Sequence, residues 1–115
     1  MKFLEQFDVI VVGGGAAGLM AAGTALARGK TVALFEKNQV LGRKVRITGK
    51  GRCNVTNDCS VEEVVAACPR GGKFLYGALS AFSPQDTMAF FQGLGVPLKT
   101  ERGRRVFPQS DNAHH

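Results

Sequence analysis

The stretch Asp8–Lys37, DVIVVGGGAAGLMAAGTALARGKTVALFEK, decides the fold of this 115-residue chain. It begins with Val9–Val12, a short β-branched run that is typical of a strand buried on both faces of a parallel sheet. A glycine-rich turn then leads into a segment rich in Ala, Leu and Met, which predicts a helix from about Gly15 to Arg28. The stretch therefore opens as a strand, a tight turn and a helix.

Three glycines at the end of this strand form the pattern G-x-G-x-x-G. We expect Gly13 to permit the tight turn, Gly15 to let the backbone approach a pyrophosphate, and Gly18 to let the helix pack close to the sheet. The first N–H groups of a helix have no partner within the helix, so this end can bind an anion. The turn is a candidate phosphate-binding loop.

A second strand and an acidic residue complete the unit. Thr31–Phe35 is a second buried apolar run, and Glu36 stands at its end, eighteen residues after Gly18. An acid at this place accepts hydrogen bonds from ribose hydroxyls and repels a 2′-phosphate. Together these features predict a dinucleotide-binding β-α-β unit, and the alternative is a plain β-α-β unit without a ligand.

An export signal or a membrane span is another alternative for the same stretch. Lys2 precedes an uncharged run from Val9 to Ala27, as in a signal peptide. However, Glu5 and Asp8 lie in the region that would have to be basic, and five glycines interrupt the apolar run. We therefore expect a cytoplasmic chain without a membrane partner.

Length and composition fit one globular domain or part of one. The chain is 44% hydrophobic, which is enough for one modest core. A doubly wound sheet needs more parallel strands than the two buried runs found here, so we expect residues 1–115 to be an incomplete domain. The terminal His114 and His115 are compatible with native residues and with the start of a tag.

Fifteen Lys and Arg residues against nine Asp and Glu residues give a formal charge of +6, which indicates anionic partners. The cations gather in two groups. One interpretation is that both groups lie in solvated loops. The alternative is that the first group folds back over the phosphates of a cofactor. The first group is Arg43, Lys44, Arg46, Lys50 and Arg52, and the second is Lys99, Arg102, Arg104 and Arg105.

The cysteines do not predict a metal site or a disulfide framework. Cys53, Cys59 and Cys68 are odd in number and include no C-x-x-C pair, and the histidines lie only at the C-terminus. We expect reduced thiols and no metal.

The region after the β-α-β unit is basic and punctuated by glycines. Asn38–Asn57 is expected to form an ordered loop around a ligand, with a short strand or helical turn near Lys44–Ile47. Gly49 and Gly51 would let the backbone lie flat against a planar ring. Thr56–Asp58 is predicted to be a turn.

Three short helices and a β-hairpin are predicted for the remainder. Ser60 and Glu63 form a capping box before the first helix, and Ser83-Pro84 opens the third. The helices are expected at about 61–67, 73–81 and 84–94, and the hairpin arms at 96–100 and 104–107. The side chains of the third helix that we expect in the core are Met88, Phe90, Phe91 and Leu94.

The segments GGGAAGLMAA, LGRKVRITGKGRCNVTN and ERGRRVFPQSDNA follow one another in this chain. With them the chain resembles the BaiN/YhiN-like flavoproteins, also labelled the aminoacetone oxidase family of NAD(P)/FAD-dependent oxidoreductases. The resemblance spans nearly all 115 residues, but family members are considerably longer. It implies that residues 1–115 are the N-terminal part of an FAD-binding domain of the two-dinucleotide-binding type, which needs the missing C-terminal part of its own chain.

The resemblance also implies where FAD would be held. Leu41 stands where the wider glutathione-reductase-like group commonly has a glycine, so the second phosphate loop departs from that pattern. The implied FAD-binding residues are Gly13, Gly15, Ala16, Ala17 and Gly18 at the pyrophosphate, Glu36 and Lys37 at the adenosine ribose, Gly42, Arg43 and Lys44 at the phosphates, and Gly49, Gly51, Arg52, Cys53 and Asn54 on the flavin side.

Two of these residues invite a more specific role. Arg52 is expected to stabilise negative charge on the reduced flavin. Cys53 is either a redox partner of the flavin or a small buried thiol, and we favour the thiol because no second cysteine stands at C-x-x-C or C-x4-C spacing. The chain offers no Ser/His/Asp set, carboxylate pair or metal cluster, so the reaction chemistry would belong to FAD.

The sequence thus predicts the FAD-binding portion of an oxidoreductase that passes hydride between NAD(P)H or a small organic substrate and FAD. One alternative is a catalytically silent fragment, and another is an RNA-associated flavoprotein that uses the basic groups. Aromatic residues do not alternate with these cations as a stacking surface requires, so we do not expect nucleic acid as a partner. These residues do not select the substrate.

Overall fold

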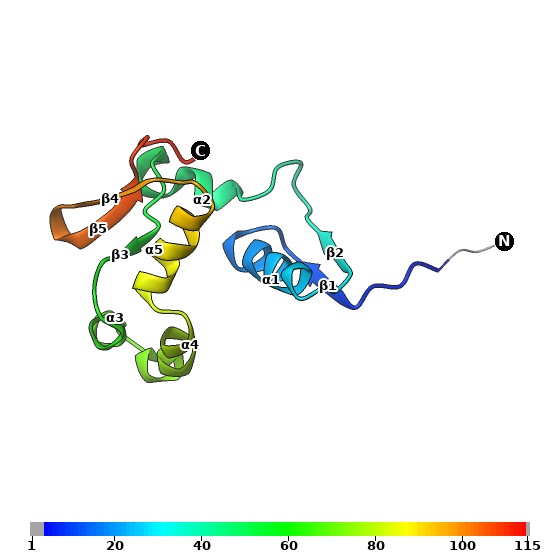
Figure 1. Ribbon diagram of the computed structural model, residues 1–115, viewed down its shortest axis with the longest axis horizontal. Helices are drawn as coiled ribbons and strands as arrows, with labels where there is room; N and C mark the ends of the chain where they lie inside the picture. Colours follow the sequence, from blue (N-terminus) through cyan, green and yellow to red (C-terminus); the bar gives the residue numbers. More distant parts are fainter. Residues whose placement is uncertain (1–3, 115) are drawn as a thin grey trace. The chain divides into compact units, whose positions relative to one another are not determined.

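The structure, a computed structural model, describes residues 4–114. Lys2 and His115 lie outside the described residues. The chain divides into two compact units, Met1–Arg46 and Ile47–His115, and each contains its own small sheet (Figure 1).

The first unit is a β-α-β unit. Strand β1 (Val9–Val12) leads through the glycine turn into helix α1 (Ala16–Ala27), and strand β2 (Val32–Phe35) pairs with β1 in parallel. Helix α1 packs against both strands, as Figure 1 shows. The predicted order of strand, helix and parallel strand is therefore confirmed, with Gly15 and Arg28 as the residues that flank the helix.

Asp8 and Thr31 fix the register of these two strands. The N–H of Asp8 donates to Thr31 Oγ1 at 2.9 Å, and the N–H of Thr31 donates to Asp8 Oδ2 at 2.9 Å. The Thr31 hydroxyl also donates to this carboxylate oxygen at 3.1 Å. The strands then pair from Val9 opposite Val32 onward. Since a slip of one residue turns every side chain of a strand to the other face, this link determines which side chains face α1.

The strands are more exposed than the sequence predicts. Val11 is buried, but Ile10, Val12 and Phe35 are 61%, 85% and 60% exposed. Burial on both faces requires further strands and a second covering layer, and the described part of the chain pairs β1 with β2 alone. The expectation that these strands are buried on both faces is wrong for the described residues.

The region predicted as a loop is partly helical. It contains helix α2 (Arg43–Ile47) and a 3-10 helix, η1 (Thr48–Gly51), so the predicted helical turn near residues 44–47 is confirmed. The predicted turn at Thr56–Asp58 is wrong, because Thr56–Asn57 forms strand β3. Its antiparallel partner, β5 (Arg105–Pro108), lies far away in the sequence, and local turn signals do not reveal such a partner.

The predicted helices of the second unit are present. The capping box of Ser60 with Glu63 forms as expected, and Ser83 forms a second box with Asp86. The helix predicted at 73–81 is divided into a 3-10 helix and an α-helix. None of the helices between residues 4 and 114 combines the length and the apolar character that crossing a membrane requires. The elements are α3 (Val61–Ala67), η2 (Gly72–Leu75), α4 (Tyr76–Ala81) and α5 (Pro84–Gly93).

The predicted hairpin consists of β4 (Leu98–Glu101), a 3-10 turn, η3 (Arg102–Arg104), and β5. Strand β5 is the middle strand of an antiparallel sheet with the order β3-β5-β4, and Figure 1 shows β3 and β4 on its two sides. Val106 and Phe107 on β5 are fully buried.

The core of the second unit lies on this hairpin. Leu98 is buried together with Val106 and Phe107, whereas Phe90 on α5 and Leu94, which follows its last residue, are 39% and 66% exposed. The prediction that Phe90 and Leu94 belong to the core is therefore wrong. Phe90 instead contacts Phe91 edge-on, with the ring centroids 5.2 Å apart.

Candidate cofactor site

The turn between β1 and α1 leaves open space beside its backbone. Gly13 has φ +102°, a conformation that side chains rarely adopt, and its N–H donates to the Phe35 carbonyl at 2.7 Å. Gly15 is extended and precedes the first residue of α1. A Cβ added at Gly13 or Gly15 would meet no atom within 4 Å. The protein itself therefore leaves room here for a group that approaches the main chain.

Gly18 has the opposite environment, because α1 passes very close to the strand. A Cβ at Gly18 would lie 1.8 Å from the Gly13 carbonyl oxygen and 3.2 Å from Val11 Cγ1. Only glycine fits at this position. The close packing of helix and strand that we expected at Gly18 is present in the structure.

The N-terminus of α1 has unpaired donors. Among the described residues, none caps this end of the helix through its side chain, and its first turn carries no acid. Ala16 and Ala17 contribute only methyl groups, and the Leu19 N–H makes the first helical hydrogen bond, to the Gly15 carbonyl at 2.9 Å. The N–H groups of the first turn and the positive end of the helix dipole suit an anion.

Glu36 lies beside this turn and is held by the backbone. Its Oε1 accepts a hydrogen bond from the Gly14 N–H at 2.8 Å, and its Oε2 accepts one from the Asn38 N–H at 2.7 Å. The Asn38 N–H, and after it the Gly14 N–H, lowers the pKa of Glu36 below its usual range. The ionised carboxylate accepts hydrogen bonds only, and each oxygen has a further lone pair for a hydroxyl donor.

Gly14 is a residue of this site that the sequence reasoning missed. Its N–H binds Glu36, and its carbonyl accepts a hydrogen bond from the Gly42 N–H at 2.8 Å. A Cβ at Gly14 would lie 2.5 Å from Leu41 Cδ2. Gly14 thus joins the first glycine turn to the acid and to the second loop. The available signal was the middle glycine of the GGG run, at a position the fingerprint leaves free.

The second loop begins with Gly42 and continues into α2. Gly42 is buried, has φ +65°, and accepts a hydrogen bond from the Arg46 N–H at 3.1 Å. Arg43 and Lys44 follow it with exposed side chains, and Lys37 is also exposed. Leu41, which departs from the expected glycine pattern, fills the space that Gly14 leaves.

In the second unit, residues 49–54 form a compact turn with several left-handed backbone conformations. Gly49, Lys50, Gly51 and Cys53 have φ angles of +59°, +57°, +87° and +63°. The N–H of Cys53 donates to the Thr48 carbonyl at 2.9 Å, and the Cys53 side chain is half-buried rather than buried.

The core of the second unit holds this turn in place. A Cβ at Gly49 would lie 2.9 Å from Phe107 Cε1 and 2.9 Å from the Asn54 nitrogen. The Asn54 side-chain amide donates to the Thr56 carbonyl at 3.0 Å and to the Val106 carbonyl at 3.1 Å. Asn54 therefore has a clear structural role, and its contact with a flavin stays a prediction.

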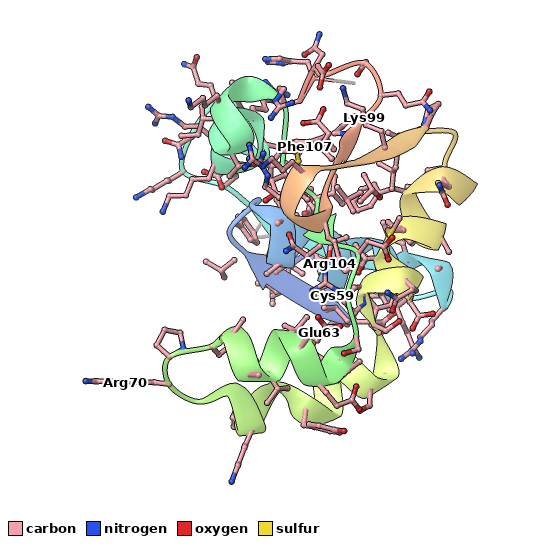
Figure 2. All side chains as sticks on the ribbon, turned by 90° about the vertical axis from the view of Figure 1, so that its left-hand side faces the viewer. Cys59, Glu63, Arg70, Lys99, Arg104 and Phe107 are labelled. Atoms are coloured by element: carbon pink, nitrogen blue, oxygen red, sulfur yellow. The ribbon has the colours of Figure 1, made fainter. Side chains whose placement is uncertain are left out.

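Arg52 belongs to a network of four charged side chains. Its guanidinium lies over the Phe107 ring, 3.9 Å from the centroid, and contacts Glu101 at 3.0 Å and Asp111 at 3.4 Å. Lys99 contacts Glu101 at 3.0 Å and Asp111 at 2.7 Å. Figure 2 labels Lys99 and Phe107 in this part of the second unit. The two carboxylates are partners that the sequence reasoning missed, because they stand 49 and 59 positions after Arg52.

These contacts shift the pKa values of all four groups toward their charged forms. The hydrogen bond to Glu101 raises the pKa of Arg52, and the hydrogen bond to Asp111 raises that of Lys99. The Lys99 ammonium lowers the pKa of both Glu101 and Asp111. The cluster is an ion network with balanced charge.

The structure thus places the predicted residues in two clusters. The glycine turn, Glu36 and the start of the Gly42 loop lie together in the first unit, and residues 49–54 form the second cluster. That both clusters bind one cofactor stays a prediction.

The second unit also contains a cavity of about 410 Å³. Asn54 and Cys59 line it, together with an ion pair between Glu63 and Arg104. Figure 2 shows Cys59, Glu63 and Arg104 close together between β3 and α3. The Arg104 guanidinium, and after it the Ser60 N–H, lowers the pKa of Glu63 to about 2. Of the residues predicted for the cofactor, only Asn54 lines this cavity.

Within residues 4–114, Cys53, Cys59 and Cys68 are free thiols. In the same range the structure shows no group of three or more His, Cys, Asp or Glu side chains that could hold a metal ion.

Comparison with known proteins identifies relatives. The family model described as HI0933-like protein Rossmann domain matches residues 7–115. The chain is 38% identical over 108 residues to a 3-dehydro-bile acid delta(4,6)-reductase of Clostridium scindens, which covers 90% of the chain and 25% of the relative. It is 44% identical over 104 residues to a ribosomal RNA dihydrouridine synthase of Haemophilus influenzae, with the same coverage. The synthase of that name from Escherichia coli is 36% identical over 93 residues, covering 81% of the chain and 23% of the relative.

Proposed function

This chain belongs to the HI0933-like Rossmann-domain family, the BaiN/YhiN-like group that its sequence resembles, and we propose that it binds FAD as part of a flavin-dependent oxidoreductase. The observation that carries the proposal is the turn between β1 and α1, where open space at Gly15 adjoins uncapped helical N–H groups. The chain spans about a quarter of the length of the curated relatives it matches. We propose that residues 1–115 form the N-terminal part of the FAD-binding domain.

The first unit suits the adenosine diphosphate half of FAD. The N–H groups of Ala16, Ala17 and Gly18 would donate to the pyrophosphate, and the absence of a Cβ at Gly15 would let it approach the backbone. Glu36, ionised and already oriented by two backbone N–H groups, would accept hydrogen bonds from the ribose hydroxyls. Its charge disfavours a 2′-phosphate, which supports FAD or NAD over NADP at this position.

The second unit would supply the flavin side. In the left-handed turn of residues 49–53, Gly51, where a Cβ would meet no atom within 4 Å, would let a planar ring approach the main chain, and Arg52 brings a guanidinium to the same turn. When bound, FAD would supply the redox chemistry by taking up a hydride from NAD(P)H or an organic substrate and passing it on. The chain's own residues would bind and orient the cofactor and set the charge around it.

The names of the three relatives compared above favour an unsaturated ring as the substrate. A delta(4,6)-reductase and a dihydrouridine synthase both add hydrogen to a carbon–carbon double bond in a ring. We propose the same class of reaction here, with reduced nicotinamide as the source of hydride. Two of the relatives act on ribosomal RNA by name, so an RNA substrate is the second candidate, and the exposed Arg43 and Lys44 suit a phosphate backbone.

The visible spectrum of the purified full chain tests the proposal. Bound flavin gives absorption bands at roughly 370 and 450 nm, and addition of NADH or NADPH without oxygen should bleach them. Colour without bleaching would support binding but not the oxidoreductase activity. A chain that neither contains nor takes up FAD would contradict the proposal, and salt-sensitive retention on RNA would favour the second candidate.

A further inference from the structure

The segment that follows β5 returns to the turn of residues 49–53. The Gln109 N–H donates to the Pro97 carbonyl at 2.9 Å, and the Ala113 N–H donates to the Gly51 carbonyl at 2.9 Å. Between these two links stands Asp111, whose backbone has φ +55°. The segment is therefore fastened at both ends, and its second link is made to the turn itself.

Asp111 adds a charged link to the same turn. Its Oδ2 contacts Lys99 Nζ at 2.7 Å and its Oδ1 contacts the Arg52 guanidinium at 3.4 Å. Glu101 bridges the same two cations, at 3.0 Å each. Each carboxylate thus contacts both cations, and removal of one would leave the cluster with an excess positive charge.

The position of Arg52 is determined from two directions. The buried ring of Phe107 supports one face of its guanidinium at 3.9 Å, and the carboxylates bind its edge. Because Glu101 lies closer to Arg52 than Asp111 does, Arg52 would stay in place without Asp111. What Asp111 adds is the compensation of charge and the link from the turn to residues 109–113.

We propose that Asp111 is a positioning residue for the flavin: it orders the turn of residues 49–53 and balances the charge of Arg52 and Lys99 there. The inference rests on the proposed FAD site. It assigns a function to a residue that lies outside the glycine fingerprint and outside the turn.

The variant Asp111→Asn removes one negative charge and keeps the size of the side chain. The matched control is Glu63→Gln, which likewise removes one carboxylate from the second unit, together with its ion pair to Arg104, but leaves the turn untouched. Asp111→Glu restores the charge and serves as the rescue. Circular dichroism on all three confirms that each chain is folded.

Two measurements on the FAD-loaded chain, and one without FAD, distinguish positioning from a merely structural role. In the FAD-loaded full chain, Asp111→Asn should weaken FAD affinity by about three- to fivefold, the factor expected for a half-exposed ion pair. It should also shift the reduction potential of the flavin to a more positive value, since excess positive charge favours the reduced, anionic form. Without FAD, trypsin should cleave the variant faster after Lys50 and Arg52 in the turn.

The outcomes separate the two proposals. A parent chain that does not bind FAD contradicts the proposed function itself. If the parent binds FAD and Asp111→Asn keeps its affinity and its potential, the inference is wrong and the proposed function stands. Support requires that Asp111→Asn changes both quantities, that Asp111→Glu restores them, and that Glu63→Gln leaves them unchanged.

Discussion

Gly18 marks the point where α1 comes closest to β1, so it gives the most direct test of the packing. In Gly18→Ala the new Cβ would meet the Gly13 carbonyl oxygen at 1.8 Å, and helix and strand would have to separate. We expect the free energy of unfolding to fall by about 3 kcal/mol, measured by urea denaturation. The matched control is Gly23→Ala in the same helix, where a Cβ meets nothing within 4 Å. The control should be stabilised by about 0.5–1 kcal/mol.

The variant Gly15→Ala should lower the affinity for FAD with little effect on the free energy of unfolding. A Cβ at Gly15 meets no protein atom, so Gly15→Ala should cost less than about 1 kcal/mol of folding free energy. The same methyl group would occupy the space proposed for the pyrophosphate, and FAD affinity should fall by about tenfold or more. Titration of the apoprotein with FAD, followed by flavin fluorescence, measures this loss. Unchanged affinity would place the phosphates elsewhere.

Gly14 and Leu41 should behave as a coupled pair. Gly14→Ala brings a methyl group to 2.5 Å from Leu41 Cδ2 and should destabilise the chain by about 1–2 kcal/mol. Shortening the neighbour by Leu41→Ala makes room, so the double variant should lose less than the sum of the two single variants. A double-mutant cycle with an interaction energy of about 1 kcal/mol is expected, and an additive result would show that the two residues do not touch in solution.

The glycine fingerprint could be predicted from sequence because each of its roles depends on neighbours in the chain. The role of Gly18 can be recognised from the sequence of the preceding strand and of its own helix. The position of Gly14 is variable in the pattern, and its importance arises from Leu41 and Glu36, which the fold brings to it. Arg52 was found from its motif, but its carboxylate partners come from β4 and the segment after β5.

Two capping boxes define where α3 and α5 begin, and both can be tested by a single atom change. Ser60 and Ser83 each accept a hydrogen bond from a backbone N–H three residues later, at 3.1 Å. Ser60→Ala and Ser83→Ala should each reduce the free energy of unfolding by about 1 kcal/mol, measured by thermal or urea denaturation. Ser80→Ala on α4, which caps no helix, is the control and should change little. Equal effects in all three variants would argue against the caps.

Helices and hairpin arms were predictable where a local signal marks their ends. Ser60 and Ser83 mark two helix starts, and Gly95, with φ +87°, follows the end of α5. Strand β3 was not predictable, because its two residues become a strand only by pairing with β5. The exposure of α5 has a similar cause. Leu98 and Phe107 take the central positions of the core, and the periodicity of the sequence does not show that the hairpin, rather than the helix, supplies the core.

Several carboxylates of the described residues have lowered pKa values and contribute to the pH dependence of stability. They hold their protons less tightly in the folded state than in the unfolded state, so their contribution is present above the unfolded pKa and disappears as the pH falls through the folded pKa. For Glu63 this window runs from pH 4.5 down to about 2. The other members of the set are Glu36, Glu62, Asp86, Glu101 and Asp111.

We therefore expect the free energy of unfolding to decrease as the pH falls from about 4.5 toward 2. Melting temperatures between pH 2 and 7 measure the profile. In Glu63→Gln the slope within this window should be shallower, because the group no longer titrates. Stability that rises toward pH 2 would contradict the lowered pKa values.

The family and the β-α-β architecture could be recognised from the sequence, because three separated motifs occur in a fixed order. The exposure of the strands could not, because burial of Ile10 and Val12 depends on layers that β1, β2 and α1 do not provide. These residues do not identify the substrate, since two of the relatives compared above are named for a bile acid and for ribosomal RNA.

The link between Asp8 and Thr31 has a consequence for protein engineering. Its three hydrogen bonds join the starting ends of the two strands. A designer who transplants residues 8–36 into a new scaffold would carry the correct alignment of the strands along with them, and Glu36 would arrive opposite Gly14. A graft that begins after Asp8 would lose the hydrogen bonds to Thr31 that align the two strands.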